Sequence, residues 1–138
     1  MKQLRLLYFN FNGRLNRLRY FLYGIPLSII MGLAYLITMN TIDDASITNT
    51  YIIMGIYFLI LIICSISGLT LTVRRLHDLN KTGWLVLIQF LSLIPVLRII
   101  SGIFGLYLLF ARGTDGENEY GDNPLNYDDY PFYDQSIE

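Results

Sequence analysis

Two long stretches without a charged residue constrain this fold more than any other feature of the sequence. They run from Tyr20 to Met39 and from Tyr51 to Val73. A helix needs about 20 apolar residues to cross a hydrocarbon core about 30 Å thick, and only there does such a stretch avoid water throughout. With 54% hydrophobic and 15% charged residues, the sequence predicts an all-α membrane protein and disfavours soluble folds.

The first of these stretches is too long for the core of a signal peptide, which has about 7 to 15 residues. No small-x-small cleavage pattern follows it at Thr38 to Asn40. We therefore expect residues 20–39 to form a permanent span.

A third apolar stretch, from Trp84 to Ala111, is interrupted by Pro95 and Arg98. As one helix it would reach roughly 42 Å at 1.5 Å per residue, enough for one span but too short for two full crossings. A single span would leave Arg98 near the bilayer midplane, at a cost of about 2.5 to 3.5 kcal/mol. Length alone favours three spans, whereas a hairpin turning near Pro95 would make four hydrophobic segments with the last pair re-entrant. Both forms of this polytopic helical bundle remain open.

Charge is strongly segregated along the chain. Residues 1–112 carry all ten Lys and Arg residues but only three acids, a net charge of +7, and eight acids follow Arg112. We expect a helical membrane domain over 1–112, with spans at about 20–39, 51–73 and 84–111. An acidic, turn-rich and flexible tail is expected over 113–138. Because cations stay in the cytoplasm, the N-terminus and the loop after Val73 are predicted to be inside and the loop over 40–50 outside.

Small side chains recur every fourth residue in both charge-free stretches. The residues in these positions are Gly24, Ser28 and Gly32, followed by Cys64, Gly68 and Thr72. Such spacing lets two helices approach closely, so we expect the two stripes to meet in a packed seam. Pro26 is expected near the beginning of its helix, where the missing N–H costs least.

Three short motifs carry the polar residues of the chain, at residues 11–21, 74–84 and 113–124. In order, the sequence there reads Phe-Asn-Gly-Arg-Leu-Asn-Arg-Leu-Arg-Tyr-Phe, Arg-Arg-Leu-His-Asp-Leu-Asn-Lys-Thr-Gly-Trp and Gly-Thr-Asp-Gly-Glu-Asn-Glu-Tyr-Gly-Asp-Asn-Pro. Their order and spacing resemble the bacterial inner-membrane proteins grouped as the domain-of-unknown-function 805 family. This resemblance implies a fold and a compartment, the bacterial cytoplasmic (inner) membrane with several passes, but no activity. The motif residues for which we expect a structural role are Gly13, Tyr20, His77, Asp78, Thr82, Gly83, Trp84, Asn118, Gly121 and Pro124.

The second motif places two arginines, a histidine and an aspartate within five residues. If the preceding helix continues through it, Arg74 and Asp78 are four residues apart and form an ion pair, while His77 projects elsewhere. One His and one Asp are too few for a metal site, and no nucleophile accompanies them. Thr82 fits the N-cap of the next helix and Trp84 an interfacial anchor. We therefore predict no catalytic residue, no metal and no cofactor.

The cations are the remaining candidates for a functional role, as contacts to the anionic groups of lipids. Candidates for this role are Arg14, Arg17, Arg74, Arg75, Lys81 and Arg98. Arg14 and Arg17 are three residues apart and could hold one phosphate between them. Gly13 is expected to bend the chain just before them.

The sequence favours a noncatalytic membrane scaffold or regulator that contacts anionic lipid or a membrane partner, with self-association as one option and no nucleic acid. Two alternatives belong to other classes of protein. A small transporter or channel subunit would use Arg98 to contact an anion, and an enzyme acting on lipid headgroups would use the segment from Arg74 to Asp78.

Overall fold

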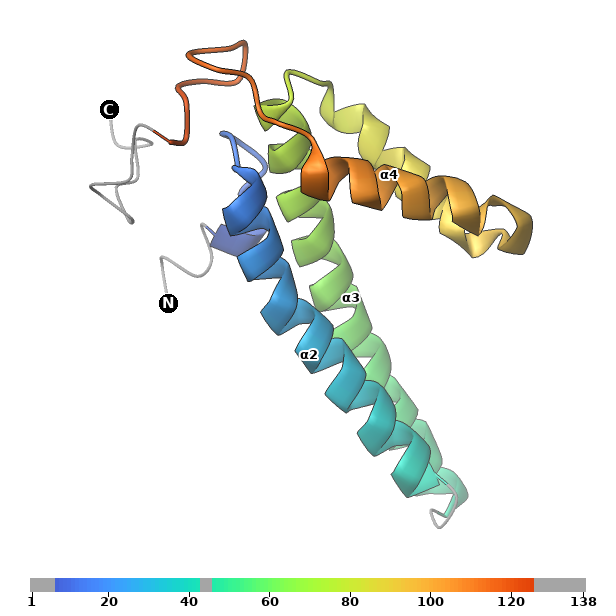
Figure 1. Cartoon of the computed structure of the whole chain (residues 1–138). Coiled ribbons are helices and arrows are strands. Elements are labelled where there is room, and N and C mark those ends of the chain that lie inside the picture. The colour runs from blue at the N-terminus through green and yellow to red at the C-terminus, as the bar shows by residue number, and fades with distance from the viewer. Residues whose placement is uncertain (1–6, 43–45, 126–138) are drawn as a thin grey trace.

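The chain folds into two helical arms that diverge from one end (Figure 1). The computed structural model describes residues 7–42 and 46–125. The long arm consists of α2 (Arg17–Ile42) and α3 (Ile47–Asp78). The second arm consists of the 3-10 helices η1 (Gly83–Leu93) and η2 (Pro95–Leu97) followed by α4 (Arg98–Phe110). The described residues contain no β-strand beyond an isolated bridge between Asn118 and Gly121, so the prediction of an all-helical protein is confirmed.

Both helices of the long arm are longer than the stretches that predicted them. With 26 residues in α2 and 32 in α3, they reach roughly 39 and 48 Å at 1.5 Å per residue. Both are long and apolar enough to cross a membrane. α3 continues past the uncharged residues 51–73, so the second motif begins in the last helical turns and not in a loop.

The two ends of α3 have clear local causes. At the start, the Ser46 side chain accepts a hydrogen bond from the backbone N–H of Asn49, which is an N-cap. At the other end, Asn80 adopts a left-handed conformation with φ of 52°. Its N–H donates to the carbonyl of His77, and the N–H of Lys81 donates to that of Leu76. This is a Schellman-type ending, in which asparagine takes the place usually held by glycine.

Pro26 does not lie near the beginning of its helix, as the sequence had suggested. It is inside α2, as the tenth residue of a helix that begins at Arg17. The charged residues before Tyr20 belong to the helix because cations are tolerated where a membrane helix leaves the hydrocarbon. A proline in the interior of a spanning helix is tolerated when neighbouring groups compensate for the lost hydrogen bond.

The glycines of the two small-residue stripes do not form the tight helix–helix contact that the sequence predicted. A Cβ atom added at Gly24, Gly32 or Gly68 would meet nothing within 4 Å outside its own helix. These positions therefore face open space and leave room beside the helices. The expected packing role of these glycines is therefore wrong, and Gly24 and Gly68 instead line one open groove.

The second arm has the turn at Pro95 that the hairpin alternative expected. Ile94 is extended, with φ of −98° and ψ of 116°, and separates η1 from η2; the residue before a proline favours this region. The Ser101 hydroxyl donates to the Ile88 carbonyl at 2.9 Å and so joins α4 to η1. One continuous helix over residues 84–111 does not occur, because the chain folds back on itself within that stretch.

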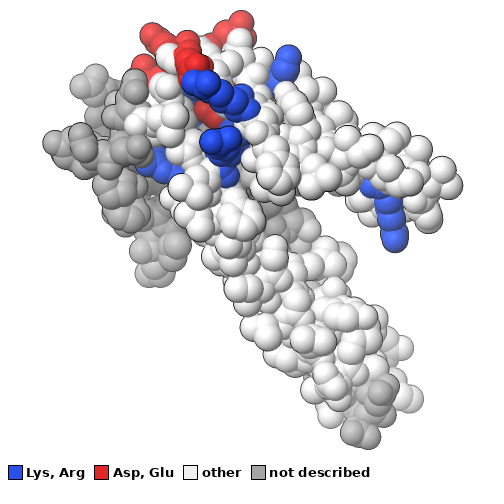
Figure 2. Space-filling model, viewed as in Figure 1, with Lys and Arg blue, Asp and Glu red and all other residues white. Residues whose placement is uncertain are grey.

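The apolar surfaces of both arms are largely uncovered, and the buried core is small. It lies where the arms meet, around Leu76, Leu79 and Leu108. Figure 2 shows most of the charged side chains at this same end, whereas the long arm beyond it is uncharged on the visible face. Surfaces of this kind suit a hydrocarbon environment. Within the expected tail, residues 113–125 are described and pack at this end, while 126–138 lie outside the described residues.

Candidate functional site: a buried polar junction

The three sequence motifs meet at the end where the arms join, around one carboxylate. Asp78 accepts hydrogen bonds from Nε of Arg14 at 3.2 Å and from Nη1 of Arg75. The side chains of Arg14, Arg75 and Asp78 are 1%, 0% and 3% exposed. We call this cluster, together with the residues 113–121 that pack on it, the polar junction.

Arg75 connects α3 to the last turn of α4. Its Nε donates to the carbonyl of Leu108 at 2.9 Å, and its Nη2 donates to that of Ala111. A third donor, Nη1, also reaches the Leu15 carbonyl at 3.4 Å. The last carbonyls of a helix have no partner within the helix, and a cation at that end also suits the helix dipole. Arg75 therefore acts as an internal cap for α4.

Arg14 organises the segment that follows α4. Its Nη1 donates to the carbonyls of Gly116 at 2.6 Å and Gly121 at 3.2 Å. Its Nη2 donates to the carbonyl of Thr114 at 2.6 Å and to the Thr114 hydroxyl at 3.1 Å. Gly116 and Gly121 have positive φ angles of 74° and 118°, which glycine adopts without steric cost. One guanidinium thus fixes a loop about 100 residues away in the chain.

Thr114 and Asn118 donate hydrogen bonds to backbone carbonyls at the C-terminal end of α3. The backbone N–H and the hydroxyl of Thr114 donate to the Asp78 carbonyl at 2.9 and 3.0 Å. Nδ2 of Asn118 donates to the His77 carbonyl at 2.9 Å and to the Thr114 hydroxyl at 2.8 Å. These contacts replace the hydrogen bonds that a further helical turn would have made.

Two glycines are required by close packing at the junction. A Cβ on Gly113 would lie 2.2 Å from Oδ2 of Asp78, and a Cβ on Gly83 would lie 3.0 Å from Cγ1 of Val73 and 3.3 Å from Nε2 of His77. The first distance leaves no space for any side chain. Gly113 had not been singled out in the sequence; the signal was its position at the head of the third motif.

His77 lies beside the junction and stacks on Tyr120, with ring centroids 3.9 Å apart and planes at 4°. Its Nδ1 is 3.3 Å from the Gly13 carbonyl. Burial lowers the pKa of His77 and the positive charge of Arg74 lowers it further, while the contact with Gly13 opposes them. The described residues contain no group of three His, Cys, Asp or Glu side chains placed to hold a metal ion.

The predicted ion pair between Arg74 and Asp78 was wrong. Asp78 pairs with Arg75, three residues before it, and with Arg14. Arg74 turns the other way, where its Nη1 donates to the Leu7 carbonyl at 3.2 Å and its Nε is buried without a partner. Both arginines lie within one helical turn of Asp78, so the helix alone does not decide between them. Arg75 instead faces the carbonyls of Leu108 and Ala111 at the end of α4, whereas Arg74 faces the segment before α2.

The six cationic candidates differ in burial and fall into three groups. Arg14 and Arg75 are buried and hydrogen-bonded to other groups of this chain. Arg74 is half-buried, whereas Arg17, Lys81 and Arg98 are exposed.

The other motif residues lie at or near the junction. The predicted bend is present, since Gly13 has φ of 84°. The N-cap role of Thr82 is confirmed by its hydroxyl, which accepts from the N–H of Trp84 at 3.4 Å. Pro124 is buried, and the Tyr20 hydroxyl is 3.4 Å from that of Thr72. Trp84 is 77% exposed, and its role as an interfacial anchor stays a prediction.

Comparison with known proteins points to one family. A family model described as "Protein of unknown function (DUF805)" matches residues 8–122, a range that contains the whole of the first two motifs and most of the third. The chain is 28% identical over 122 residues to proteins named inner membrane protein YhaI from Escherichia coli strain K12 and from Escherichia coli O157:H7. In each case the match covers 85% of this chain and 87% of the relative. No solved structure matches.

Proposed function

The chain belongs to the DUF805 family, and from that premise we propose that it is a noncatalytic scaffold of the inner membrane that presents the exposed cations beside its polar junction to anionic lipid. The relatives named inner membrane protein and the two long apolar helices support this location. One observation carries the noncatalytic assignment: the ionic groups of the junction are consumed by one another and by backbone carbonyls.

An enzyme acting on lipid headgroups would need the same ionic groups open to its substrate. Asp78 and its two arginine partners are at most 3% exposed, and their fixed hydrogen bonds make a rigid support. A supporting role fits this geometry because it requires stability of the junction and no access to it.

The contacts also support a topology. Arg14 is hydrogen-bonded to residues 114, 116 and 121, so the segments before α2 and after α4 lie on one side of the membrane. The excess of cations around this end supports a cytoplasmic position for it. In this arrangement α2 and α3 cross the bilayer, while the second arm enters from the cytoplasmic side and returns to it.

Thiol labelling tests this topology with a matched pair of positions. In a Cys64→Ser background, we introduce either Thr48→Cys, in the first turn of α3, or Glu119→Cys, in the closing segment; both residues are exposed. A reagent that cannot cross the membrane should label position 48 in spheroplasts and position 119 only after lysis. Labelling of position 119 in intact spheroplasts would reject the returning arm.

The exposed cations beside the junction are the proposed lipid contacts. Arg17 and Lys81 remain uncovered, and each cation near an anionic surface contributes about 1 kcal/mol. Two such contacts together favour anionic over neutral lipid by up to about 30-fold.

Trp84 offers a direct readout of these contacts. It is the only tryptophan of the chain and lies three residues after Lys81, so its fluorescence reports on neighbouring lipid. Brominated phosphatidylglycerol should quench it more strongly than brominated phosphatidylcholine. The Arg17→Ala/Lys81→Ala double variant should lose this preference, whereas Arg112→Ala, which removes an exposed cation already paired with Asp115, should keep it. Equal quenching of the unmodified protein by both lipids would remove the basis for lipid contact.

A further inference from the structure

An open groove lies between the two arms and is lined by residues of α2, α3, η1 and α4. Its volume is about 1130 Å³, and most of its lining is apolar. A helix is about 10 Å across and rises 5.4 Å per turn, so this volume is equivalent to roughly two to three turns of helix. Apolar grooves inside a bilayer do not stay empty, because lipid chains or protein fill them.

Four glycines on three helices line the groove, so no side chain projects from the wall at these positions. An added Cβ would meet nothing within 4 Å outside the same helix at Gly24 of α2, Gly68 of α3, or Gly102 and Gly105 of α4. Small residues in these positions let the backbone of another helix come close. No helix within residues 7–42 and 46–125 takes up that space.

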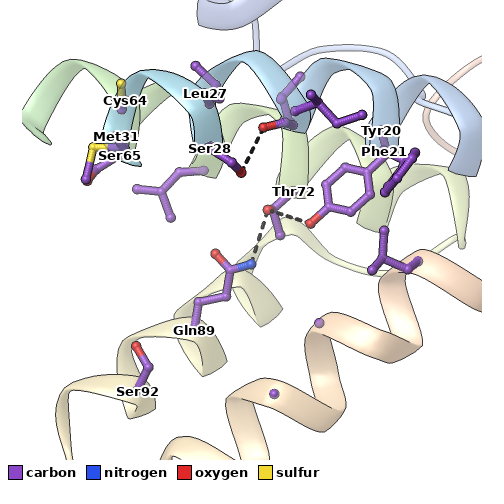
Figure 3. Close-up of a pocket in the computed structure, with 18 of the residues that line it drawn as sticks. Tyr20, Phe21, Leu27, Ser28, Met31, Cys64, Ser65, Thr72, Gln89 and Ser92 are labelled. Carbon is purple, nitrogen blue, oxygen red and sulfur yellow. Dashed lines mark hydrogen bonds between the residues drawn. The ribbon is translucent and has the colours of Figure 1, made fainter. Parts of the chain in front are cut away.

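The polar side chains that line the groove near Thr72 already have hydrogen-bond partners within the chain. Figure 3 shows Thr72 between Tyr20 and Gln89, and its hydroxyl accepts from Nε2 of Gln89 at 3.2 Å. The hydroxyl of Ser28 donates to the carbonyl of its own helix at Gly24. An occupant of the groove therefore meets a mainly apolar wall.

Arg98 introduces the one charge that this arm carries. It is the only Lys or Arg between residues 82 and 111, and it is exposed. The spacing of positions 98, 102, 105 and 109 places Arg98 on the same helical face as Gly102, Gly105 and Leu109, which line the groove. Its Nε donates to the carbonyl of Ser92 at 3.1 Å, and Ser92 is also a lining residue. Figure 2 shows a cationic patch on the outer part of this arm.

We propose that this groove binds a transmembrane helix of another protein, and that a carboxylate of that helix pairs with Arg98. An arginine placed within the hydrocarbon is costly unless it is paired. This chain cannot supply the pair, because no Asp or Glu occurs in residues 20–39, 51–73 or 84–111. A second copy is excluded as the source of the carboxylate for the same reason.

A phospholipid is the weaker occupant because Arg98 lies at the far end of α4 from the polar junction. The phosphate groups of the cytoplasmic leaflet lie at the level of the polar junction, and α4 carries Arg98 away from it. With 13 residues in α4, this separation is roughly 20 Å along the helix. The inference deepens the proposed scaffold role and rests on it in one respect, namely that the second arm lies in the hydrocarbon.

A reconstitution experiment tests the proposal with defined probes. The purified full-length protein carries a photoreactive amino acid at Leu106, a lining residue, or at Ile103, which is exposed but is not part of the lining. Vesicles of phosphatidylethanolamine and phosphatidylglycerol contain a synthetic Leu/Ala helix of about 22 residues with one Glu near its middle. The matched peptide has Gln instead.

We expect position 106 to crosslink the Glu peptide about tenfold more than the Gln peptide, and position 103 to show no such preference. Arg98→Lys should keep the preference and Arg98→Leu should abolish it. Equal crosslinking of both peptides to position 106, persistence of the preference in Arg98→Leu, or adducts of phospholipid alone would overturn the proposal. The peptide comparison uses an unaltered Arg98, so it does not depend on the folding of a variant.

The same experiment separates this inference from the proposed lipid contacts. The Arg17→Ala/Lys81→Ala variant should crosslink the Glu peptide normally even though its selectivity for anionic lipid is lost. If its crosslinking falls as well, the groove is not an independent site, and this inference is rejected.

Discussion

The buried carboxylate of Asp78 allows a sharp test of the polar junction. In Asp78→Asn the side chain keeps its shape, but the negative charge between two buried guanidinium groups is lost. One amide oxygen can still accept a hydrogen bond, whereas the amide nitrogen is a donor facing a donor. Removing one partner from a buried ionic cluster costs about 3 to 5 kcal/mol, a large share of a typical stability of 5 to 15 kcal/mol.

The assay is reversible unfolding in mixed micelles, followed by helical circular dichroism as the fraction of denaturing detergent rises. Asp115→Asn is the matched control, because Asp115 pairs with Arg112 on the surface, where the two side chains are 73% and 81% exposed. We expect that control to change the free energy of unfolding by about 1 kcal/mol or less.

A double variant completes the test. Arg14→Leu alone should also destabilise the protein, and Asp78→Asn/Arg14→Leu should cost less than the sum of the two single changes, because the second change removes a charge that the first left unpaired. If Asp78→Asn destabilised no more than Asp115→Asn, the reasoning that the junction holds the fold together would be refuted.

Three further predictions address the same end of the molecule. Gly113→Ala, whose methyl group would overlap the Asp78 carboxylate, should release the closing segment and expose it to protease, whereas Gly102→Ala, with nothing within 4 Å, should leave the digestion pattern unchanged. Asn80→Gly should stabilise the end of α3 and Asn80→Ala should destabilise it, each by about 1 kcal/mol in the same unfolding assay, because φ is positive there; equal stability of the two variants would contradict this. The lowered pKa of His77 means that the unfolded chain binds a proton more readily, so stability should fall as the pH drops through about 6.5. His77→Gln should flatten this dependence, and an unchanged pH profile would argue against His77 as its source.

The sequence was sufficient to predict the helical class and the approximate location of the long arm. Charge-free stretches report directly on the solvent around a helix, so α2 and α3 were found from residues 20–39 and 51–73. Their true ends were missed because arginines at a membrane surface extend a helix without breaking it. The same error shifted Pro26 from the interior of α2 to its beginning.

The polar junction was harder to predict because it is made entirely of distant contacts. Nothing local distinguishes Arg14, which is buried, from Arg17, which is exposed. Arg14 is buried because residues 113–121 pack against it in the folded protein, and this contact cannot be read from the local sequence. Helical phase did not separate Arg74 from Arg75 either, because both positions lie within one turn of Leu71 and of Asp78. The carbonyls of Leu108 and Ala111, which Arg75 binds, come from a distant part of the chain.

The length of the third apolar stretch did not determine its form. A count of residues allowed one long span or a hairpin, and the turn at Ile94 and Pro95 gives the latter. The small-residue stripes misled for a related reason, because their spacing signals that a helix can approach but does not identify which helix does. In this chain the space beside Gly24 and Gly68 is left open.

The hydrogen bonds between Arg14 and residues 114–121 also have a consequence for biosynthesis. A ribosome delivers Arg14 about 100 residues before the loop that holds it, and this loop leaves the exit tunnel after the three apolar segments of residues 20–111. Until then, Arg14, Arg75 and Asp78 lack most of their carbonyl partners, and both arms can move relative to each other. Membrane insertion therefore precedes the locking of the fold, and a chain truncated before Gly113 would insert its helices but never complete the assembly.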